Sequence, residues 1–470
     1  MTTAVVVGSG PNGLAAAITL AEAGIEVRVL EAADVVGGGM RSGEALLPGM
    51  LHDHCAAVHP MAVGSPFVVE HDLGRYGLTW AWPEIDCAHP LDGGTAGVLF
   101  RSVTRTAAEL GPDGRLWRRL FERTAAEYGD TKTDIMGPLL RLPSHPIKLA
   151  RFGIPALAPA SALAALMRTE QTKALFGGIT AHAFHRPDTP MSAAVGLGIL
   201  TAGHRDGWPV VVGGSQAIAS AMTALFTELG GHIETGVAVG YSEPVPVADI
   251  VMWDVSPTAL AGILGDRMPA RVARALGRFR YGPSAFKVDF AVEGGVPWAA
   301  EAVRQAGTVH LGGSFAELAA TERAVHAGRM PDRPFVLVAQ QYLADPARSV
   351  GDVHPVYSYA HVPHGYTGDA FGAVVAQIER FAPGFRDRVV AHRVSSPADF
   401  AEGNANFVGG NILTGAKDIR QLVFGPRIGL RPYDIGITGH YLCSAATPPG
   451  PGAHGMCGVQ AARRALRSLP

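Results

Sequence analysis

The chain has few cysteines, no long hydrophobic run and no basic residue near its start. Its cysteines are Cys55, Cys87, Cys443 and Cys457. They show neither CxxC spacing nor the density of a secreted disulfide framework. The longest apolar runs are interrupted by glycine, proline or charge well short of a membrane span. The first positive side chain is Arg28, so the basic region of a signal peptide is missing. We therefore expect a cytoplasmic protein.

Charge is also scarce. Charged residues make up 17% of the sequence, below the usual quarter, and 39 Lys and Arg against 41 Asp and Glu give a net charge of −2. This balance offers no basic surplus for nucleic acid, so no nucleic-acid partner is expected. Hydrophobic residues make up 47%, which excludes disorder as a global description. A length of 470 residues is sufficient for about three domains and a large core without metal or disulfide support.

The first residues have the pattern of a βαβ unit. Residues 4–7 form an uninterrupted apolar run, as expected for a parallel strand buried on both faces. A glycine-rich turn follows, and residues 14–23 are rich in alanine and leucine with one apolar helical face. Gly24 is placed to end this helix, and residues 26–30 predict a second strand.

Further elements of the same kind recur downstream. A second strand–helix–strand unit is expected from residues 210–212, a helix at about 216–229 and a strand at 232–239. Additional strands are expected at 250–253 and 435–443, and a helix from about Met456 to Leu469. The stretches between differ, with longer helices and strands such as 285–292. This pattern predicts one nucleotide-binding domain made of residues 1–66, 205–275 and 425–470, with a second domain made of residues 67–204 and 276–424.

The turn after the first strand is a GxGxxG motif in its full context. Gly8 permits the tight turn, Gly10 lets the backbone approach a pyrophosphate, and Gly13 allows close packing of helix on strand. The helix N-terminus then offers free N–H groups and a positive dipole end to the phosphates. Glu31, eighteen positions beyond Gly13, is placed to accept hydrogen bonds from the ribose of an adenosine. The motif alone does not separate FAD from NAD.

The residues after the motif indicate a flavin. Residues 31–42, with glycines at 37–39 and then Met40 and Arg41, resemble the extended fingerprint of glutathione-reductase-type flavoproteins, in the branch shared by amine oxidases and phytoene desaturases. Residues 47–54, 248–257 and 441–456 are similar to segments of phytoene desaturase/dehydrogenase-like FAD oxidoreductases, including pyridine nucleotide-disulphide oxidoreductase domain proteins. Two features depart from these families: Ser444 and Ala446 stand where glycine is usual, and the Trp/Tyr-rich C-terminal pattern of amine oxidases is missing.

The resemblance implies an α/β fold: a Rossmann-like FAD-binding domain of glutathione-reductase type with an inserted α+β substrate domain. FAD is the implied cofactor. By this resemblance the backbone of Val239 would pair with the adenine, and the helix beginning at Met456 would direct its positive end at the flavin. The cofactor-binding residues expected from motif and resemblance are Gly8, Gly10, Pro11, Asn12, Gly13, Glu31, Ala32, Gly38, Gly39, Met40, Arg41, Val239, Thr447, Gly455 and Met456.

The flavin would accept a hydride at N5 while the protein supplies position and electrostatics, so no catalytic side chain is required. If the substrate also loses a proton, His54 or His59 is the candidate general base, because the densest cluster of protonatable groups spans residues 52–59. Ordinary loop histidines are the favoured interpretation of this cluster. No metal site is expected there, because a second ligand pair at suitable spacing is missing.

One segment is basic, apolar and broken by proline. Residues 135–169 contain no acidic residue, while Arg141, Lys148, Arg151 and Arg168 are scattered among apolar residues. An ordinary helical cap is the favoured interpretation, and peripheral contact with a membrane surface is the alternative.

These observations predict an FAD-dependent oxidoreductase, a dehydrogenase or desaturase that takes a hydride from a small apolar substrate such as an isoprenoid or lipid. A flavin amine oxidase is the main alternative. A saturase working in reverse, a non-redox isomerase and a non-redox prenyl-binding or lipid-binding protein, which GDP-dissociation inhibitors exemplify in this fold, remain open. Oxygen and a quinone are both candidate electron acceptors.

Overall fold

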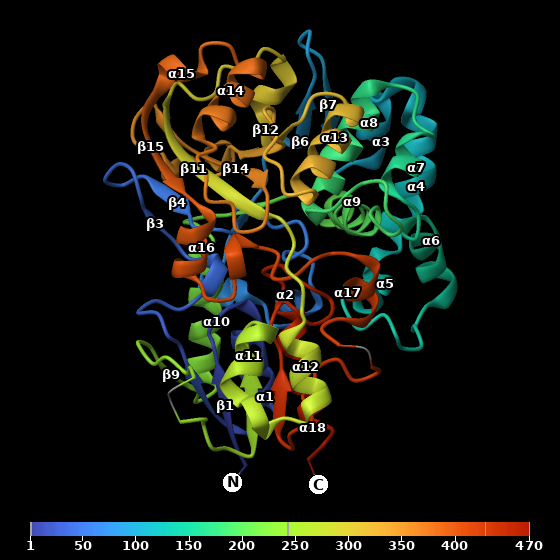
Figure 1. Cartoon of the computed structure of the whole chain (residues 1–470). Coiled ribbons are helices and arrows are strands. Elements are labelled where there is room, and N and C mark those ends of the chain that lie inside the picture. Colours follow the sequence, from blue (N-terminus) through green and yellow to red (C-terminus); the bar gives the residue numbers. More distant parts are fainter. Residues whose placement is uncertain (1, 242–243, 428, 470) are drawn as a thin grey trace.

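The computed structural model describes residues 2–241, 244–427 and 429–469, which form two domains stacked end to end (Figure 1). The lower domain in this view is built on a five-stranded sheet in the order β16-β10-β1-β2-β9, with all neighbouring strands parallel. Its strands are β1 (Thr3–Val7), β2 (Glu26–Leu30), β9 (His232–Glu234), β10 (Ile250–Trp253) and β16 (His440–Leu442).

Helices cover both faces of this sheet. Because side chains alternate along a strand, Ala4 and Val6 of β1 pack in one apolar cluster with α1 (Pro11–Glu22), α10 (Gln216–Glu228) and α18 (Met456–Leu466). Val5 and Val7 pack in a second cluster with α11 (Pro257–Leu264) and α12 (Ala270–Gly277). The central strand is therefore buried on both faces, as its uninterrupted apolar sequence predicts.

The sequence-based prediction of a second βαβ unit in residues 210–239 was wrong. Its first strand, β8 (Val210–Val211), pairs antiparallel with β5 (Trp80–Ala81) in a separate two-stranded sheet. An apolar run indicates a buried strand but does not identify the sheet that it joins.

Two other expected strands are shorter in the structure. The strand expected at 232–239 ends at Glu234, because Gly236 turns the chain with φ +70°. The strand expected at 435–443 is confined to His440–Leu442. The segment 237–239 nevertheless stays beside β2, since the Val237 amide donates to the Glu31 carbonyl at 2.8 Å.

The upper domain has a seven-stranded mixed sheet in the order β15-β11-β14-β13-β12-β6-β7. Its strands are β6 (Ile85–Pro90), β7 (Ala96–Leu99), β11 (Ser284–Glu293), β12 (Ala306–Leu311), β13 (Val336–Ala339), β14 (Val353–Val362) and β15 (Val389–Ser395). The face that carries Phe286 and Val288 packs on α14 (Phe371–Phe381). The opposite face carries Ala285, Tyr357 and Tyr359 and joins a cluster that includes Cys55 and Phe407.

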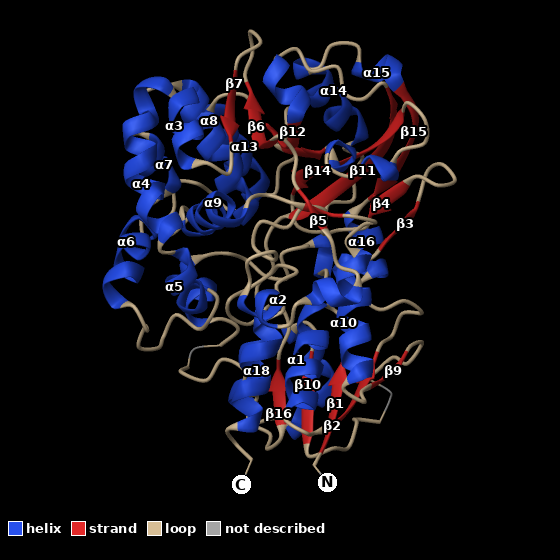
Figure 2. Cartoon of the chain, turned by 180° about the vertical axis from the view of Figure 1, so that it is seen from behind, coloured by secondary structure: helices blue, strands red, loops and turns tan. Residues whose placement is uncertain are grey.

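A layer of helices flanks one side of this domain (Figure 2). Its helices are α3 (Val103–Glu109), α4 (Gly114–Ala126), α5 (Tyr128–Ile135), α6 (Pro146–Ala156), α7 (Ala160–Ala164), α8 (Glu170–Thr180) and α9 (Ala194–Asp206), with α13 (Phe315–His326) beside α8. Within the described residues, no helix combines the length and apolar composition needed to cross a bilayer.

Short elements connect the two domains. The hairpin of β3 (Ser42–Glu44) and β4 (Leu51–Asp53) meets β14 of the upper domain. The helix α2 (Pro66–Glu70) contributes Phe67 and Val68 to the core of the lower domain, and Leu73 and Leu78 follow them there. The stretch after residue 66 therefore packs first on the lower domain before the chain enters the upper one. The remaining helices are α15 (Phe385–Arg388), α16 (Pro397–Gly403) and α17 (Ile419–Phe424).

Candidate cofactor site

A cavity of about 500 Å³ lies at the carboxyl edge of the parallel sheet and reaches the upper domain. This volume falls within the usual range for ligand pockets. Its lining comes from many separate segments of the chain: residues 7–12, 30–33, 38–41, 55–56, 237–239, 254–256, 402–407, 412, 414, 444–445 and 451–453. Of the expected cofactor residues, those that line it are Gly8, Gly10, Pro11, Asn12, Glu31, Ala32, Gly38, Gly39, Met40, Arg41 and Val239.

The glycine-rich loop has no room for side chains. A Cβ atom on Gly13 would lie 2.0 Å from the carbonyl oxygen of Gly8. A Cβ atom on Gly10 would lie 2.8 Å from Oδ2 of Asp254, and Gly8 has φ +101°. The close approach at Gly13 is the helix–loop packing that the motif predicts. At Gly10 the structure adds a second reason for glycine, because a buried carboxyl lies directly beside it.

The second glycine cluster lies against the first. A Cβ atom on Gly38 would lie 3.1 Å from the Cα atom of Gly10. Arg41 holds this cluster in place, since its Nε donates to the Gly38 carbonyl at 3.0 Å and its Nη2 donates to the Gly403 carbonyl. The guanidinium therefore joins the loop to the end of α16 at the cavity wall.

Glu31 organises the far end of the loop. Its Oε2 accepts hydrogen bonds from the Ser9 amide at 2.8 Å and the Ser9 hydroxyl at 2.5 Å, and its Oε1 accepts from the Ala33 amide at 2.9 Å. Oε2 thus uses both of its lone pairs, whereas Oε1 retains one, and the residue lines the cavity. Glu31 is thus placed both to fix the loop and to accept from a ribose hydroxyl.

The C-terminal segment reaches the cavity through residues other than those expected. Ser444, Ala445 and residues 451–453 line it, whereas Thr447, Gly455 and Met456 do not, nor does Gly13. The reason is the packing of α18 on α1: a Cβ atom on Gly455 would lie 2.8 Å from Cβ of Ala15. The first amide of α18 is also occupied, because Met456 N donates to Nδ1 of His454 at 3.1 Å.

The two candidate catalytic histidines lie outside the cavity lining. His59 is buried with its Nε2 at 2.8 Å from the Ser215 hydroxyl, and burial lowers its pKa to about 4. His54 is exposed. Between them, Cys55 and Ala56 do line the cavity. The structure therefore gives neither histidine a position from which it could take a proton from a ligand in this cavity.

A buried carboxyl that the sequence argument missed lies under the loop. Asp254 follows β10, and its Oδ2 accepts from the Gly13 amide at 2.9 Å. Burial is the main cause that raises its pKa to about 7, and the charge of Glu31 acts in the same direction. Its backbone carbonyl accepts from Nδ2 of Asn406 at 2.9 Å, which fixes the segment 402–407 against the cavity.

A second missed group lies behind Cys55. Lys287 of β11 is buried, forms an ion pair with Asp289 and has its Nζ 4.7 Å from the ring centre of Tyr357. The Tyr357 hydroxyl donates to the Cys55 carbonyl at 2.7 Å. His52 adds a ring nitrogen, Nδ1, 3.4 Å from Asp289 Oδ1. The sequence does contain a signal for this pair: two charged residues stand two positions apart in an otherwise apolar strand, and alternate residues of a strand share a face.

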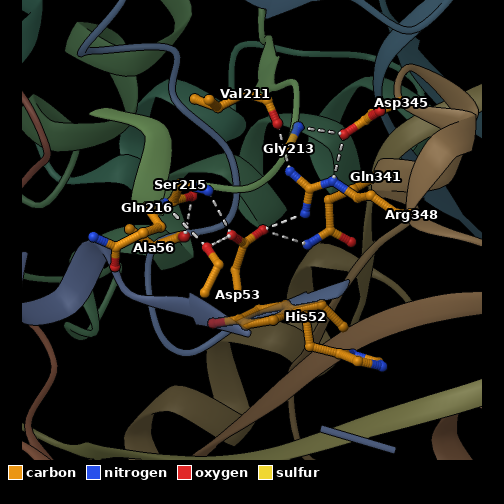
Figure 3. Close-up of polar contacts among 12 residues, drawn as sticks. His52, Asp53, Ala56, Val211, Gly213, Ser215, Gln216, Gln341, Asp345 and Arg348 are labelled. Atoms are coloured by element: carbon orange, nitrogen blue, oxygen red, sulfur yellow. Dashed lines mark hydrogen bonds and ion pairs between the residues drawn. The ribbon is translucent and has the colours of Figure 1, made fainter. Parts of the chain in front are cut away.

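Figure 3 shows the buried network beside this cluster. Nη1 of Arg348 lies 2.6 Å from Oδ2 of Asp53, and its Nε lies 3.0 Å from Oδ2 of Asp345. Its Nη2 donates to the Val211 carbonyl at 2.6 Å, and the Ser215 amide donates to Asp53 at 2.8 Å. Although burial opposes it, the Arg348 guanidinium and these donors lower the pKa of Asp53.

The residues around the cavity fit FAD. At the N-terminus of α1, Pro11 has no N–H and the Gly13 amide donates to Asp254, so among the described residues the Asn12 amide is the one of these three that stays open to a phosphate. Asn12 Oδ1 and Ser444 Oγ are buried without a hydrogen-bond partner among the described residues, and both residues line the cavity. Glycine packing, the positive end of α1 with its open Asn12 amide, and Glu31 together match an adenine dinucleotide. No cluster of three or more His, Cys, Asp or Glu side chains suited to a metal occurs within the described ranges.

This fold is shared with solved oxidoreductases, among them an amine oxidase, and part of the chain is similar in sequence to a desaturase. Residues 6–66 match the family model described as an NAD(P)-binding Rossmann-like domain. The chain is a homologue of the hydroxyneurosporene desaturase of Cereibacter sphaeroides, with 30% identity over 294 residues. That match covers 56% of this chain and 58% of the desaturase, so the chain spans less than two thirds of that relative's length.

Solved structures superimpose on almost the whole length of this chain. An oxidoreductase from Methanosarcina mazei superimposes with a TM-score of 0.63 and 15% identity, over 99% of this chain and 100% of that one. A putrescine oxidase bound to putrescine superimposes with a TM-score of 0.60 and 17% identity, over 99% of this chain and 98% of that one. At these identities the likeness is one of fold.

Proposed function

We propose that the protein is an FAD-dependent dehydrogenase or desaturase that takes a hydride from an apolar substrate of isoprenoid or lipid-like class. The observation that carries the proposal is the continuity of the cavity. It begins at the glycine-rich loop and Glu31 and ends at Cys55, Phe407 and Ile412, which belong to or pack on a largely apolar cluster that also holds Phe184, Phe335, Phe400, Tyr357 and Tyr359.

The roles of the chain's own residues follow from this arrangement. The open Asn12 amide and the positive end of α1 would bind the pyrophosphate, and Glu31 would accept from the ribose. Bound FAD would supply the hydride acceptor. The apolar cluster would exclude water and orient the substrate, while Asp289 holds the buried Lys287 ammonium in place. No side chain is assigned to proton transfer, and His54 and His59 are not proposed for it.

Two relatives bear on the substrate. The homologous desaturase is named for a hydroxylated carotenoid, which supports the isoprenoid class. The likeness to putrescine oxidase, which is one of fold, supports a flavin amine oxidase as the second candidate. A non-redox lipid-binding protein of the same fold would bind the apolar ligand without reducing flavin.

The cofactor assignment is tested with Gly10→Val. The purified protein is expected to be yellow and to release FAD on denaturation, whereas Gly10→Val is expected to lose most of its flavin, because the new side chain meets Asp254 and fills the phosphate approach. Gly129→Ala is the matched control, since a Cβ atom there meets nothing within 4 Å. A folded Gly10→Val protein with stoichiometric FAD would contradict the assignment.

The reaction class is tested by anaerobic reduction of the flavin. Hydroxyneurosporene in detergent is expected to bleach the absorption of the bound flavin, and putrescine is expected to leave it unchanged. Bleaching by putrescine alone would favour an amine oxidase, and bleaching by neither would favour the non-redox alternative. Admitting oxygen, or adding a quinone under nitrogen, then identifies the electron acceptor by the rate at which the absorption returns.

A further inference from the structure

A helical lobe of the upper domain, formed by residues 114–169 and containing α4, α5, α6 and α7, has an exceptional concentration of exposed apolar side chains. Among the residues that the structure describes, eighteen large apolar side chains are exposed, and seven of them lie in this lobe. They are Leu139, Leu140, Leu142, Ile147, Ile154, Leu157 and Leu166. Leu142 is 96% exposed and Ile147 is 72% exposed. Scattered exposed apolar residues need no explanation, but a concentration of this size does.

The helix α6 carries the centre of this surface. Ile147, Arg151 and Ile154 are spaced four and three residues apart and so share one helical face. Ala156 is the only residue of this helix that is fully buried. Figures 1 and 2 both place α6 at the outer edge of the molecule, on the side away from the seven-stranded sheet. The apolar face is therefore presented outward.

The lobe also carries a positive surplus, in a chain whose net charge is −2. Residues 114–169 contain nine Lys and Arg against four Asp and Glu, a net charge of +5. Three of the four acids form ion pairs within the lobe, among them Glu127 with Arg151 at 2.6 Å and Asp134 with Arg141 at 3.2 Å. The surplus lies mainly on α4, where Arg115, Arg118 and Arg119 are exposed.

The positive charge of the lobe favours one kind of binding partner for the apolar face over another. A second copy of the chain would bring one lobe of net charge +5 against another, and like charges oppose that contact. An anionic bilayer surface would attract the basic side chains while its acyl region accepts the apolar ones.

We propose that residues 114–169 dock on a bilayer that contains anionic lipid, with Leu142, Ile147 and Ile154 entering the boundary between head groups and acyl chains. The contact lies on the surface and inserts no helix across the membrane. This proposal does not depend on the proposed function, because it needs neither FAD nor a substrate.

The test is co-sedimentation with vesicles of phosphatidylcholine alone and of phosphatidylcholine mixed equally with phosphatidylglycerol. Wild-type protein is expected to sediment with the mixed vesicles and less with the neutral ones. In Leu142→Ser/Ile147→Ser the partition coefficient is expected to fall about tenfold or more, because two large apolar side chains no longer leave water. Arg118→Ser/Arg119→Ser is expected to weaken binding to the mixed vesicles specifically.

Matched controls lie elsewhere on the surface. Val247→Ser/Leu430→Ser changes side chains that are 96% and 79% exposed, close to the values at Leu142 and Ile147, and is expected to bind like wild type. Arg271→Ser/Arg274→Ser removes two exposed charges from α12 and is likewise expected to be neutral. FAD content, measured in every variant, is expected to stay constant, so failure of the cofactor assignment would be visible separately.

Three results would overturn the proposal. The first is a wild-type protein that sediments with neither kind of vesicle, and the second is equal binding by Leu142→Ser/Ile147→Ser and wild type. The third is a wild-type dimer in light scattering that Leu142→Ser/Ile147→Ser converts to a monomer, which would make the lobe an interface between copies of this chain.

Discussion

At the scale of single residues, Asp254 bears most directly on cofactor affinity. Its carboxyl accepts from the Gly13 amide, lies beside Gly10 and lines the cavity, so it shares the phosphate end of the site with the N-terminus of α1 and the open Asn12 amide. Because burial raises its pKa to about 7, it is largely neutral at pH 6 and largely ionised at pH 8. A pyrophosphate bound nearby would disfavour the ionised form further.

Asp254→Asn is therefore expected to tighten FAD binding at pH 8, by about tenfold or more if the two charges interact with the usual strength near a protein surface. At pH 6 the variant and the wild type are expected to bind alike, since both are then neutral at this position. The measurement is calorimetric titration of the apoprotein with FAD at the two pH values. An affinity ratio that is the same at both pH values would show that Asp254 does not titrate in the site.

The sequence predicts part of this site and misses part, for a physical reason. Gly8, Gly10, Gly13 and Glu31 could be found because strand, turn and helix are contiguous and their spacing is set by local geometry. Asp254 lies 241 residues from Gly13, its hydrogen-bond donor, so no local pattern joins the two. The contacts made by α18 were likewise not predictable, because a helix start gives no information about the helix against which it packs.

At the scale of elements, the network of Arg348, Asp53 and Asp345 connects segments from both domains. It links β4, the strand β8, the start of α10 and the short helical turn at Pro346–Arg348. Both Arg348 and Asp53 are almost wholly buried. Since β4 leads directly into Cys55 at the cavity wall, this network also fixes the position of that wall.

Arg348→Met is expected to lower the free energy of unfolding by about 3–5 kcal/mol, because it leaves the two carboxylates buried without their partner. Urea unfolding measures the change. Arg463→Met, which removes a surface arginine 3.5 Å from Glu70, is the matched control and is expected to cost little. Adding Asp53→Asn to Arg348→Met is expected to recover part of the loss, and a double variant no more stable than the single one would argue against uncompensated charge as the cause.

The elements themselves were predictable where local pattern and tertiary role agree. The strands β1 and β2 and the helices α1 and α10 form where their apolar periodicity places them. The apolar run at Val210–Val211 is a strand too, but its partner is Trp80–Ala81 rather than the parallel sheet. Partner choice depends on the path of the whole chain, which periodicity does not encode.

At the scale of the whole molecule, several histidines are buried in the neutral form. Burial lowers the pKa of His59, His89, His204 and His454 to about 4, against an ordinary value of 6.5. Between these pH values the unfolded chain binds protons at these positions that the native state does not. Asp86 and Asp254 act in the opposite direction, since burial raises the pKa of each to about 7, but they are fewer.

The free energy of unfolding is therefore expected to fall as the pH drops from about 6.5 toward 4. The decrease is about 1.4 kcal/mol per pH unit for each proton that the unfolded state binds in excess of the native state. Urea midpoints at pH 5 and pH 7 measure the difference, and the midpoint at pH 5 is expected to be lower. His59→Gln removes one of the titrating groups and is expected to make the slope shallower. A midpoint that rises on acidification would mean that the buried carboxyls outweigh the histidines.

The strand order β16-β10-β1-β2-β9 also constrains how the protein is made. The central strand β1 is synthesised first, yet its neighbour β10 follows more than two hundred residues later, and β16 comes later still. A nascent chain on the ribosome thus displays an unpaired edge of β1 for most of its synthesis, which is the kind of surface that invites wrong pairing or chaperone binding. The cavity wall is not closed until residues 444–453 have emerged. Binding of the proposed FAD would therefore follow the emergence of residues 444–453, and added FAD would rescue only chains whose synthesis has already passed that point.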